Sequence, residues 1–314
     1  MDINNVTPTE EMPNLASKYA LKGLFFKRED KHPLGSHKGR SLPHMIDSAI
    51  ISTPEGQKIS FAISSSGNAG IASAKYISEL NKTRDLDQKI NLEIFVGKNI
   101  ESEKKNILMN TEKSDQENIK VTESVRPLQS LLEKEKMGDE KAGVYSLRQS
   151  TNPLALVGYS NLAKEISKVP NLSAVFIAVS SGTSALGIAN EFNNLGNKAE
   201  IHIVQTVSCH PIAKEFDKDF SQNISEKTFE KSEAKAIVDK VAFRKDDLIK
   251  AVKRSGGSGW IPNEKQIKEA RELLSKELDT EVNANMALSF AGLLKAISSG
   301  KEWTGNILCI ISGR

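Results

Sequence analysis

The chain repeats one local pattern, in which a short apolar strand ends in small polar residues and a helical pattern follows at once. Residues 59–63 form one such apolar run, which leads into a Ser-rich cluster and then into apolar residues spaced about one turn apart. Residues 174–179 lead in the same way into a second Ser-rich cluster and a second helical stretch. Strands that alternate with helices form parallel sheets with helical crossovers. The pattern therefore predicts an α/β fold.

The alternation runs through both halves of the chain. Further strands are expected at 24–26, 92–96, 119–122, 144–145, 201–205 and 306–311, and further helices at 101–110, 127–136, 153–166, 246–254, 264–277 and 285–296. The Gly- and Ser-rich segment 255–259 predicts a mobile loop. Two α/β halves predict two three-layer domains with mostly parallel sheets and a cleft between them.

Composition excludes several classes of protein. With 314 residues the chain can bury a sizeable core, and 38% apolar with 26% charged residues is typical of a soluble globular protein. A net charge of +3 and an aromatic share of 5% give little attraction for nucleic acid or a membrane surface. The two cysteines, Cys209 and Cys309, provide no disulfide scaffold and no Cys-rich metal site. We therefore expect no nucleic-acid partner, no membrane association, no metal and a cytoplasmic location.

Lys38 stands out among the lysines because of its position. It follows a turn that contains Pro33 and Gly35, and it precedes a stretch with helical spacing of apolar residues. Most lysines are solvated surface groups. A lysine at a helix N-terminus, however, lies in positive potential, which lowers its pKa and favours the neutral amine. A neutral amine is the form that reacts with an aldehyde to give a Schiff base.

Two loops and the end of the last strand are candidate binding elements. Ser65 to Gly70 and Ser180 to Ser184 each lie between a strand and a helix, so each is either a capped helix start or an anion site made of backbone N–H groups and hydroxyls. The first would hold a carboxylate and the second a phosphate. Neither loop has a P-loop or dinucleotide fingerprint. Ser312 follows the last strand, either as a plain polar end or as a hydroxyl at the ligand-binding edge of a sheet.

In this order, the segments resemble those of fold-type II pyridoxal-phosphate enzymes, the group of tryptophan synthase β subunit, threonine synthase, O-acetylserine sulfhydrylase and threonine dehydratase. Phe26-Lys27-Arg28-Glu29-Asp30 and Pro33-Leu34-Gly35-Ser36-His37-Lys38-Gly39-Arg40 resemble the family's lysine motif. The resemblance covers nearly the whole chain and is closest overall to threonine synthase-like proteins, through 152–166 and 285–293. It implies pyridoxal 5'-phosphate as the cofactor, a homodimer, and a small amino acid as the substrate.

The resemblance also implies roles for individual residues. Lys38 would be the catalytic lysine. The implied cofactor-binding residues are His37, Lys38, Asn68, Ser180, Ser181, Gly182, Thr183, Ser184 and Ser312, and the implied substrate-binding residues are Ser65, Ser66, Gly67, Asn68, Ala69 and Ser150. The large cofactor-binding domain would comprise 1–45 and 151–314, and 46–150 would form a small domain that closes on the substrate, with the cofactor in the cleft.

Several positions depart from the family pattern. Ser180 and Thr183 stand where glycine is common in the phosphate loop, and Gly39 stands where threonine synthases have Asp. The pair His37-Lys38 is instead similar to tryptophan synthase β subunits. Ala155 stands where threonine synthases have an Arg that binds the substrate phosphate. We therefore expect a poor threonine synthase that prefers a small hydroxy or acetylated amino acid such as serine.

These observations leave three hypotheses for function. The first is a lyase or synthase of the threonine synthase, dehydratase or sulfhydrylase type, acting by elimination or replacement at the β or γ carbon. A neutral Ser312 beside the pyridine nitrogen fits this chemistry, because it gives a weaker electron sink than a carboxylate would. The second is a weak or inactive relative that binds a ligand or partner, which the altered phosphate loop favours. The third, a nicotinamide-dependent oxidoreductase, lacks the glycine fingerprint and ranks last.

Overall fold

The computed structural model describes residues 6–65, 67–85, 88–138, 143–217 and 231–313, which divide into two compact units. Unit 1 contains the described residues of His32–Gly158, and unit 2 contains Val6–Lys31 and the described residues from Tyr159 onward. These bounds differ from the predicted ones, because 32–45 and 151–158 cluster with unit 1. The assignment of one unit to cofactor binding and the other to closure stays a prediction.

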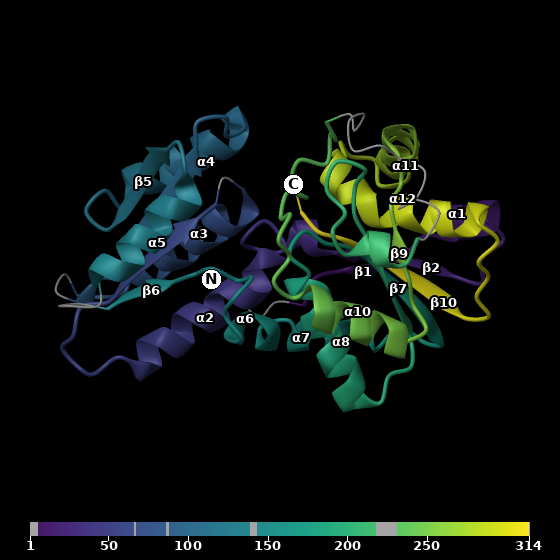
Figure 1. Cartoon of the computed structure of the whole chain (residues 1–314), viewed down its shortest axis with the longest axis horizontal. Helices are drawn as coiled ribbons and strands as arrows, with labels where there is room; N and C mark the ends of the chain where they lie inside the picture. Colours follow the sequence, from purple (N-terminus) through teal and green to yellow (C-terminus); the bar gives the residue numbers. More distant parts are fainter. Residues whose placement is uncertain (1–5, 66, 86–87, 139–142, 218–230, 314) are drawn as a thin grey trace. The chain divides into compact units, whose positions relative to one another are not determined.

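Unit 1 is built on a parallel sheet with the strand order β5-β4-β3-β6. The strands are β3 (Ser60–Ser64), β4 (Asn91–Gly97), β5 (Ile119–Ser124) and β6 (Val144–Ser146). Alternate side chains face opposite sides: Phe61 and Ile94 enter the core beneath α2 and α3, whereas Ala62 and Phe95 pack with Leu131 of α5. Helices α2 (Lys38–Ser52), α3 (Asn68–Asn81) and α4 (Ser102–Ser114) thus share one apolar core, and α5 (Pro127–Gly138) covers the other face (Figure 1).

Unit 2 is built on a second sheet with the order β1-β2-β10-β7-β8-β9. Its strands are β1 (Thr9–Glu11), β2 (Leu24–Arg28), β7 (Leu172–Ala178), β8 (Glu200–Val204), β9 (Gly259–Trp260) and β10 (Asn306–Ile311). All neighbours are parallel except β1 and β2. Helices α1 (Pro13–Lys18), α11 (Glu264–Glu277) and α12 (Ala284–Ser298) share one apolar core with the sheet, in which the Phe26 and Phe290 rings lie 5.5 Å apart.

The other face of this sheet carries α7 (Ser160–Ile166), α8 (Thr183–Leu195) and α10 (Lys245–Arg254) (Figure 1). Two short 3-10 helices, Glu29–Lys31 and Ala213–Glu215, also lie in unit 2. Each unit therefore has three layers with a mostly parallel sheet, and the predicted α/β class is confirmed.

One predicted helix, 153–166, is divided in the structure. Helix α6 (Leu154–Val157) ends before Gly158, and α7 begins at Ser160. Gly158 packs directly against the backbone of Arg40 and Ser41 in α2. The chain bends where it makes this close approach, and the residue there has no side chain.

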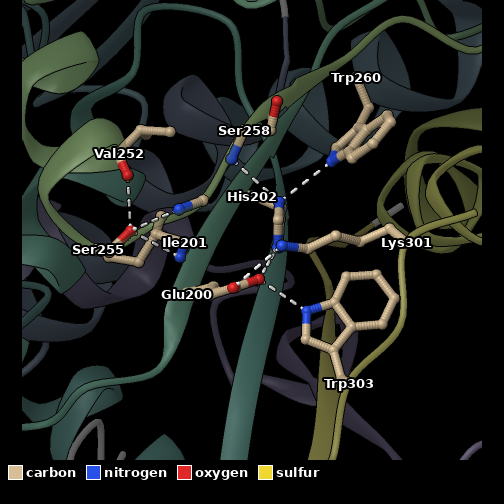
Figure 2. A network of polar contacts seen from close by, with 10 residues as sticks. Glu200, Ile201, His202, Val252, Ser255, Ser258, Trp260, Lys301 and Trp303 are labelled. Atoms are coloured by element: carbon tan, nitrogen blue, oxygen red, sulfur yellow. Dashed lines mark hydrogen bonds and ion pairs between the residues drawn. The ribbon is translucent and has the colours of Figure 1, made fainter.

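The Gly- and Ser-rich segment 255–259 is held in place, contrary to the mobile loop that its composition predicts. The Ser258 N–H donates to His202 Nδ1 at 3.1 Å, and Ser255 Oγ accepts the Ile201 N–H at 3.0 Å (Figure 2). Gly257 lies so close to the Ile201 backbone that a side chain there would overlap it. The glycines serve tight packing against β8, which composition alone does not distinguish from mobility.

A polar network anchors this segment to the sheet (Figure 2). His202 is fully buried, and its Nδ1 also accepts the Trp260 Nε1–H at 3.1 Å. Because Nδ1 accepts two N–H groups, the ring proton is on Nε2, which donates to Glu200 Oε2 at 2.9 Å. Glu200 also accepts from Trp303 Nε1 at 2.7 Å and pairs with Lys301 at 3.1 Å. The network links β8, β9 and the segment before β10.

Candidate active site

Lys38 is the first residue of α2, and a compact turn fixes its backbone. The Gly35 N–H donates to the His32 carbonyl at 2.7 Å, and Gly35 has a φ of +87°, which favours glycine. The Lys38 N–H then donates to Ser36 Oγ at 3.3 Å. Ser36 is fully buried, so this turn is part of the packed interior and not a loose connection.

Two contacts show which way α2 runs across the sheet of unit 1. Thr53, just after the helix, lies 3.0 Å from the Tyr145 hydroxyl in β6. Ser41, in the first turn, accepts a hydrogen bond from the Gln149 amide, which follows β6. The helix is therefore antiparallel to the strand, and Lys38 lies toward the carboxyl edge of the sheet. Ligands of parallel α/β sheets bind at this edge.

Burial lowers the pKa of the Lys38 ammonium from 10.5 to about 8. No charged neighbour contributes to this shift, and within the described part of the chain no carboxylate forms an ion pair with Lys38. About half of the lysine is therefore neutral near pH 8, where an ordinary lysine is almost wholly charged. The lysine thus has the basicity that a nucleophile or general base requires near neutral pH.

The predicted carboxylate loop lies at the same edge of unit 1, between β3 and α3. Ser65 Oγ accepts the Gly70 N–H at 3.1 Å and the Gly67 N–H at 3.3 Å, so this hydroxyl stabilises the start of α3. Asn68 is the first residue of α3, and its partly exposed amide has no hydrogen bond to another described residue. Ser66 lies outside the described residues. Ala69 is the second residue of α3 and is partly exposed.

The predicted substrate residue Ser150 follows β6 in unit 1 and is partly exposed. Its neighbour Gln149 is buried and donates to Ser41 in α2. The contact joins this segment to the turn of α2 that follows Lys38. Unit 1 therefore brings His37, Lys38, the loop around Asn68 and the segment of Ser150 to the carboxyl side of one sheet.

In unit 2, the predicted phosphate loop joins β7 to α8. Gly182 is the N-cap residue of α8, with a φ of +85°. A side chain at this position would be strained, and its Cβ would lie 2.7 Å from Leu248 Cδ2. Thr183 and Ser184 are buried in the first turn of α8. The N–H groups of a first helical turn have no partner within the helix and attract anions.

Two sets of hydrogen bonds that hold this loop in place were not predicted from the sequence. Ser180 Oγ accepts the N–H groups of Val238 and Asp239, both at 3.0 Å, so a distant segment is attached to the loop. Gln205 is fully buried, and its amide donates to the Ser180 carbonyl at 3.4 Å. Ser181 Oγ lies 3.0 Å from Thr183 Oγ1, which leaves these two hydroxyls linked within the loop.

Strand register places Ser312 beside the same loop. Strand β10 is parallel to β7, with Cys309 opposite Phe176. Continued to the end of the strands, this register sets Ser312 level with Val179, one residue before Ser180. The Ser289 hydroxyl donates to the Ile310 carbonyl at 2.8 Å and fixes the end of β10. Unit 2 thus brings Ser180, Ser181, Gly182, Thr183, Ser184 and Ser312 to one sheet edge.

The described residues contain no cluster of three or more His, Cys, Asp or Glu side chains that would hold a metal ion. Both cysteines are buried thiols. In the part of the chain that the structure covers, none of the helices has the length and apolar character needed to cross a bilayer.

Solved structures with a similar fold include enzymes that act on amino acids. A pyridoxal 5'-phosphate-dependent aspartate racemase is 17% identical with a TM-score of 0.78, covering 98% of this chain and 90% of its own. A serine racemase from Dictyostelium discoideum is 19% identical with a TM-score of 0.75, covering 98% and 92%. An L-serine ammonia-lyase from the fungus Rhizomucor miehei is 16% identical with a TM-score of 0.75, covering 98% and 93%. At these identities the likeness shows the fold.

The family itself follows from the sequence. No curated protein sequence matches the chain. A family model described as pyridoxal-phosphate dependent enzyme matches residues 1–313. With this match over the whole fold, and with the predicted lysine, loops and serine at the edges of the two sheets, the chain belongs to the family of pyridoxal-phosphate-dependent enzymes.

Proposed function

We propose that this enzyme is a lyase that eliminates the β-substituent of a small hydroxy amino acid, with L-serine as the first candidate substrate. The single observation that carries the proposal is the partly buried Lys38, whose pKa is lowered to about 8 at the start of α2. A lysine of this kind exchanges protons with a substrate carbon near neutral pH. The family is pyridoxal-phosphate dependent, which supplies the class of chemistry.

The residues of both units fit pyridoxal phosphate. Lys38 offers an aldehyde an amine that is about half neutral near pH 8, and the first turn of α8 offers N–H groups to a phosphate. Gly182 allows the chain to enter that turn at a positive φ, where a side chain would be strained and its Cβ would meet Leu248. Ser312 follows β10 beside this loop and would face the ring nitrogen of the cofactor. When bound, the cofactor supplies an electron sink for bonds at the substrate Cα.

The proposed roles of the chain's own groups follow from their positions. The first turn of α3 and the Asn68 amide would bind the substrate carboxylate and orient its Cα. Neutral Lys38 Nζ would take the Cα proton, and the resulting ammonium would return a proton to the departing hydroxyl. Ser312 is a neutral hydroxyl and would leave the cofactor a weak electron sink. A weak sink favours elimination of the β-substituent over transamination.

Substrate size is supported by the packing of Ala155. This residue is fully buried in the apolar core of unit 1, together with Leu42 and Met45 of α2. The position therefore has no room for the phosphate-binding arginine that a threonine synthase would carry there. The similar solved structures include a serine racemase and an L-serine ammonia-lyase, which supports a substrate without a phosphate group.

A second candidate is a weakly active relative, and one observation favours it. Ser180 Oγ already accepts two backbone N–H groups from Val238 and Asp239. The side chain thus holds the segment of Val238 and Asp239 against the predicted phosphate loop, at a position where glycine is common in the family, and the loop offers a phosphate less open backbone. Weak cofactor retention would follow.

One experiment separates the two candidates. The purified protein is first titrated with pyridoxal phosphate, and its visible absorption reports binding. It is then titrated with L-serine, L-threonine, O-acetylserine and O-phosphohomoserine. The products measured are pyruvate, 2-oxobutyrate, threonine and phosphate. We expect a cofactor band, pyruvate from L-serine and little phosphate release. Lys38→Ala should abolish both the band and turnover, whereas Lys58→Ala, an exposed lysine of the same unit, should change neither.

A band without turnover of any of these amino acids would support the weakly active relative. Efficient phosphate release with threonine formation would overturn the proposed substrate class. Borohydride reduction followed by peptide mapping should place the cofactor on Lys38, and a label on another lysine would contradict its assigned role.

A further inference from the structure

Within the described residues, the chain passes between its two units twice, and both crossings contact the same short stretch of helix. The first crossing lies between Lys31 and His32, and the second lies between Gly158 and Tyr159. His32 and Gly158, the unit 1 residues at these crossings, both pack against residues 39–41 of α2. These residues directly follow Lys38.

The first contact is between His32 and Gly39. His32 is 3% exposed, and its Nδ1 accepts the Leu34 N–H at 3.1 Å, which fixes the ring. The ring occupies the space that a side chain at position 39 would need, so that even a methyl group there would overlap it. The imidazole of His32 therefore fits beside position 39 only because Gly39 has no side chain.

The second contact is between Gly158 and the α2 backbone. A Cβ at Gly158 would lie 2.7 Å from the Arg40 carbonyl oxygen and would overlap the Ser41 Cα. Both opposing groups are backbone atoms, so no side-chain movement would relieve the overlap. This glycine permits a closer approach between α6 and α2 than any other residue would.

We propose that His32 and Gly158 are positioning residues that clamp the first turn of α2 from both chain crossings and thereby hold the Lys38 amine in its buried place. The assignment of a catalytic role to Lys38 rests on the proposed function, but the clamp itself is a property of unit 1. Packed interiors transmit small displacements because they leave little free volume. Loss of either contact would let the first turn move and expose Lys38 to water.

The test measures Lys38 in the cofactor-free protein. Each protein is acetylated briefly with acetic anhydride over a pH series, and peptide mass spectrometry measures how much of Lys38 has reacted. The extent of reaction is scaled to its plateau at high pH in the same variant, which gives the pH midpoint of Lys38. Exposed Lys58 is the internal reference. The wild-type midpoint should lie near 8. In His32→Ala and in Gly158→Ala it should rise by about one unit toward 10.5, which lowers the neutral fraction at pH 8 about fivefold.

The paired variant His32→Ala/Gly39→Ala tests the size match. The new methyl group at position 39 fills space that the imidazole has left, so the midpoint should return at least halfway to that of the wild type. Gly143→Ala is the matched control, because a Cβ at exposed Gly143 meets nothing within 4 Å, and its midpoint should equal that of the wild type.

Midpoints within about 0.3 units of wild type in both His32→Ala and Gly158→Ala would overturn the clamp, as would a double variant no closer to wild type than His32→Ala. If Gly158→Ala does not fold, as judged by circular dichroism, the comparison of His32→Ala with the double variant decides alone. Because no cofactor is present, the result is independent of whether L-serine proves to be the substrate.

Discussion

Lys27 Nζ lies 2.6 Å from Glu165 Oε2 in the interior of unit 2, where the lysine is fully buried and the carboxylate almost so. Lys27 also donates to the Thr7 carbonyl at 2.5 Å, which attaches the segment before β1 to the sheet. Removal of one member of a buried pair leaves the other charge without compensation in the interior.

The first prediction concerns this pair. Lys27→Met should lower the free energy of unfolding by about 3–5 kcal/mol, measured by urea denaturation. The matched control is Lys31→Met, whose half-exposed side chain lies 3.3 Å from Glu10 and should contribute at most about 1 kcal/mol. Equal effects of the two substitutions would contradict a buried, structural role for Lys27.

The second prediction concerns the stability of the cofactor-free protein against pH. The folded state lowers the pKa of Lys38 from 10.5 to about 8, so between these values the unfolded chain binds more protons. The free energy of unfolding should therefore rise with pH across this window. Below pH 8 Lys38 is charged in both states, and the buried ammonium destabilises the folded state by its full amount. Lys38→Met should remove this rise and should stabilise the protein at pH 7 by about 1–3 kcal/mol, since the side chain is only partly buried. A Lys38→Met variant less stable than wild type at pH 7 would contradict the conclusion that burial of the Lys38 ammonium destabilises the folded state.

The third prediction concerns the phosphate loop. Gly182→Val should weaken pyridoxal phosphate binding at least about tenfold, because the new side chain is strained at a φ of +85° and meets Leu248. Ser181→Ala keeps the backbone path and should change binding less than about threefold. Equilibrium titration of the absorption band measures both variants, and thermal unfolding in parallel shows whether the loss is confined to binding. Unchanged affinity of Gly182→Val for pyridoxal phosphate would show that this loop does not bind the cofactor phosphate.

The fourth prediction concerns Glu200 in the network of Figure 2. Burial raises its pKa, but hydrogen bonds from His202, Trp303 and Lys301 outweigh this and lower it to about 2. The ionised carboxylate therefore adds stability that is present above pH 4.5 and is lost as pH falls toward 2. Glu200→Gln should cost about 1–2 kcal/mol at pH 7, discounted for partial exposure, and nearly nothing at pH 2. Glu233→Gln, in an exposed pair with Arg271, is the control and should cost under about 0.5 kcal/mol.

The sequence predicts elements well where local signals agree. Helix α11 matches its predicted bounds of 264–277, because Asn263 and Gln266 form a capping box at its start. Strand β10 also matches, since a run of apolar residues buried on both faces has a clear length. The split of 153–166 was not predicted, because the cause is a contact between Gly158 and a helix more than a hundred residues earlier in the chain.

The candidate site shows the same division. The positions of Lys38 and of both loops follow from strand–turn–helix order, which is local. The supports of the site are not local: Gln205 beneath Ser180, and His32 against Gly39, are visible only once the chain has folded. The segment of Val238 bound to Ser180 belongs to this second class, whereas the capping of α3 by Ser65 is local and is one of the two alternatives that the sequence offers for this loop.

The strand order of unit 2 has a consequence for synthesis on the ribosome. Strand β2, made early, pairs with β1 on one side and with β10, made last, on the other, with Leu24 opposite Ile307. The described residues of unit 1 all lie within one stretch of sequence, His32–Gly158, so its strands have been made by the time this stretch has emerged. Chains grow at about 5–20 residues per second, so the β1–β2 ribbon waits many seconds with one edge uncovered. That edge exposes unpaired backbone groups during the wait, which makes the nascent N-terminal ribbon the place where a chaperone would act.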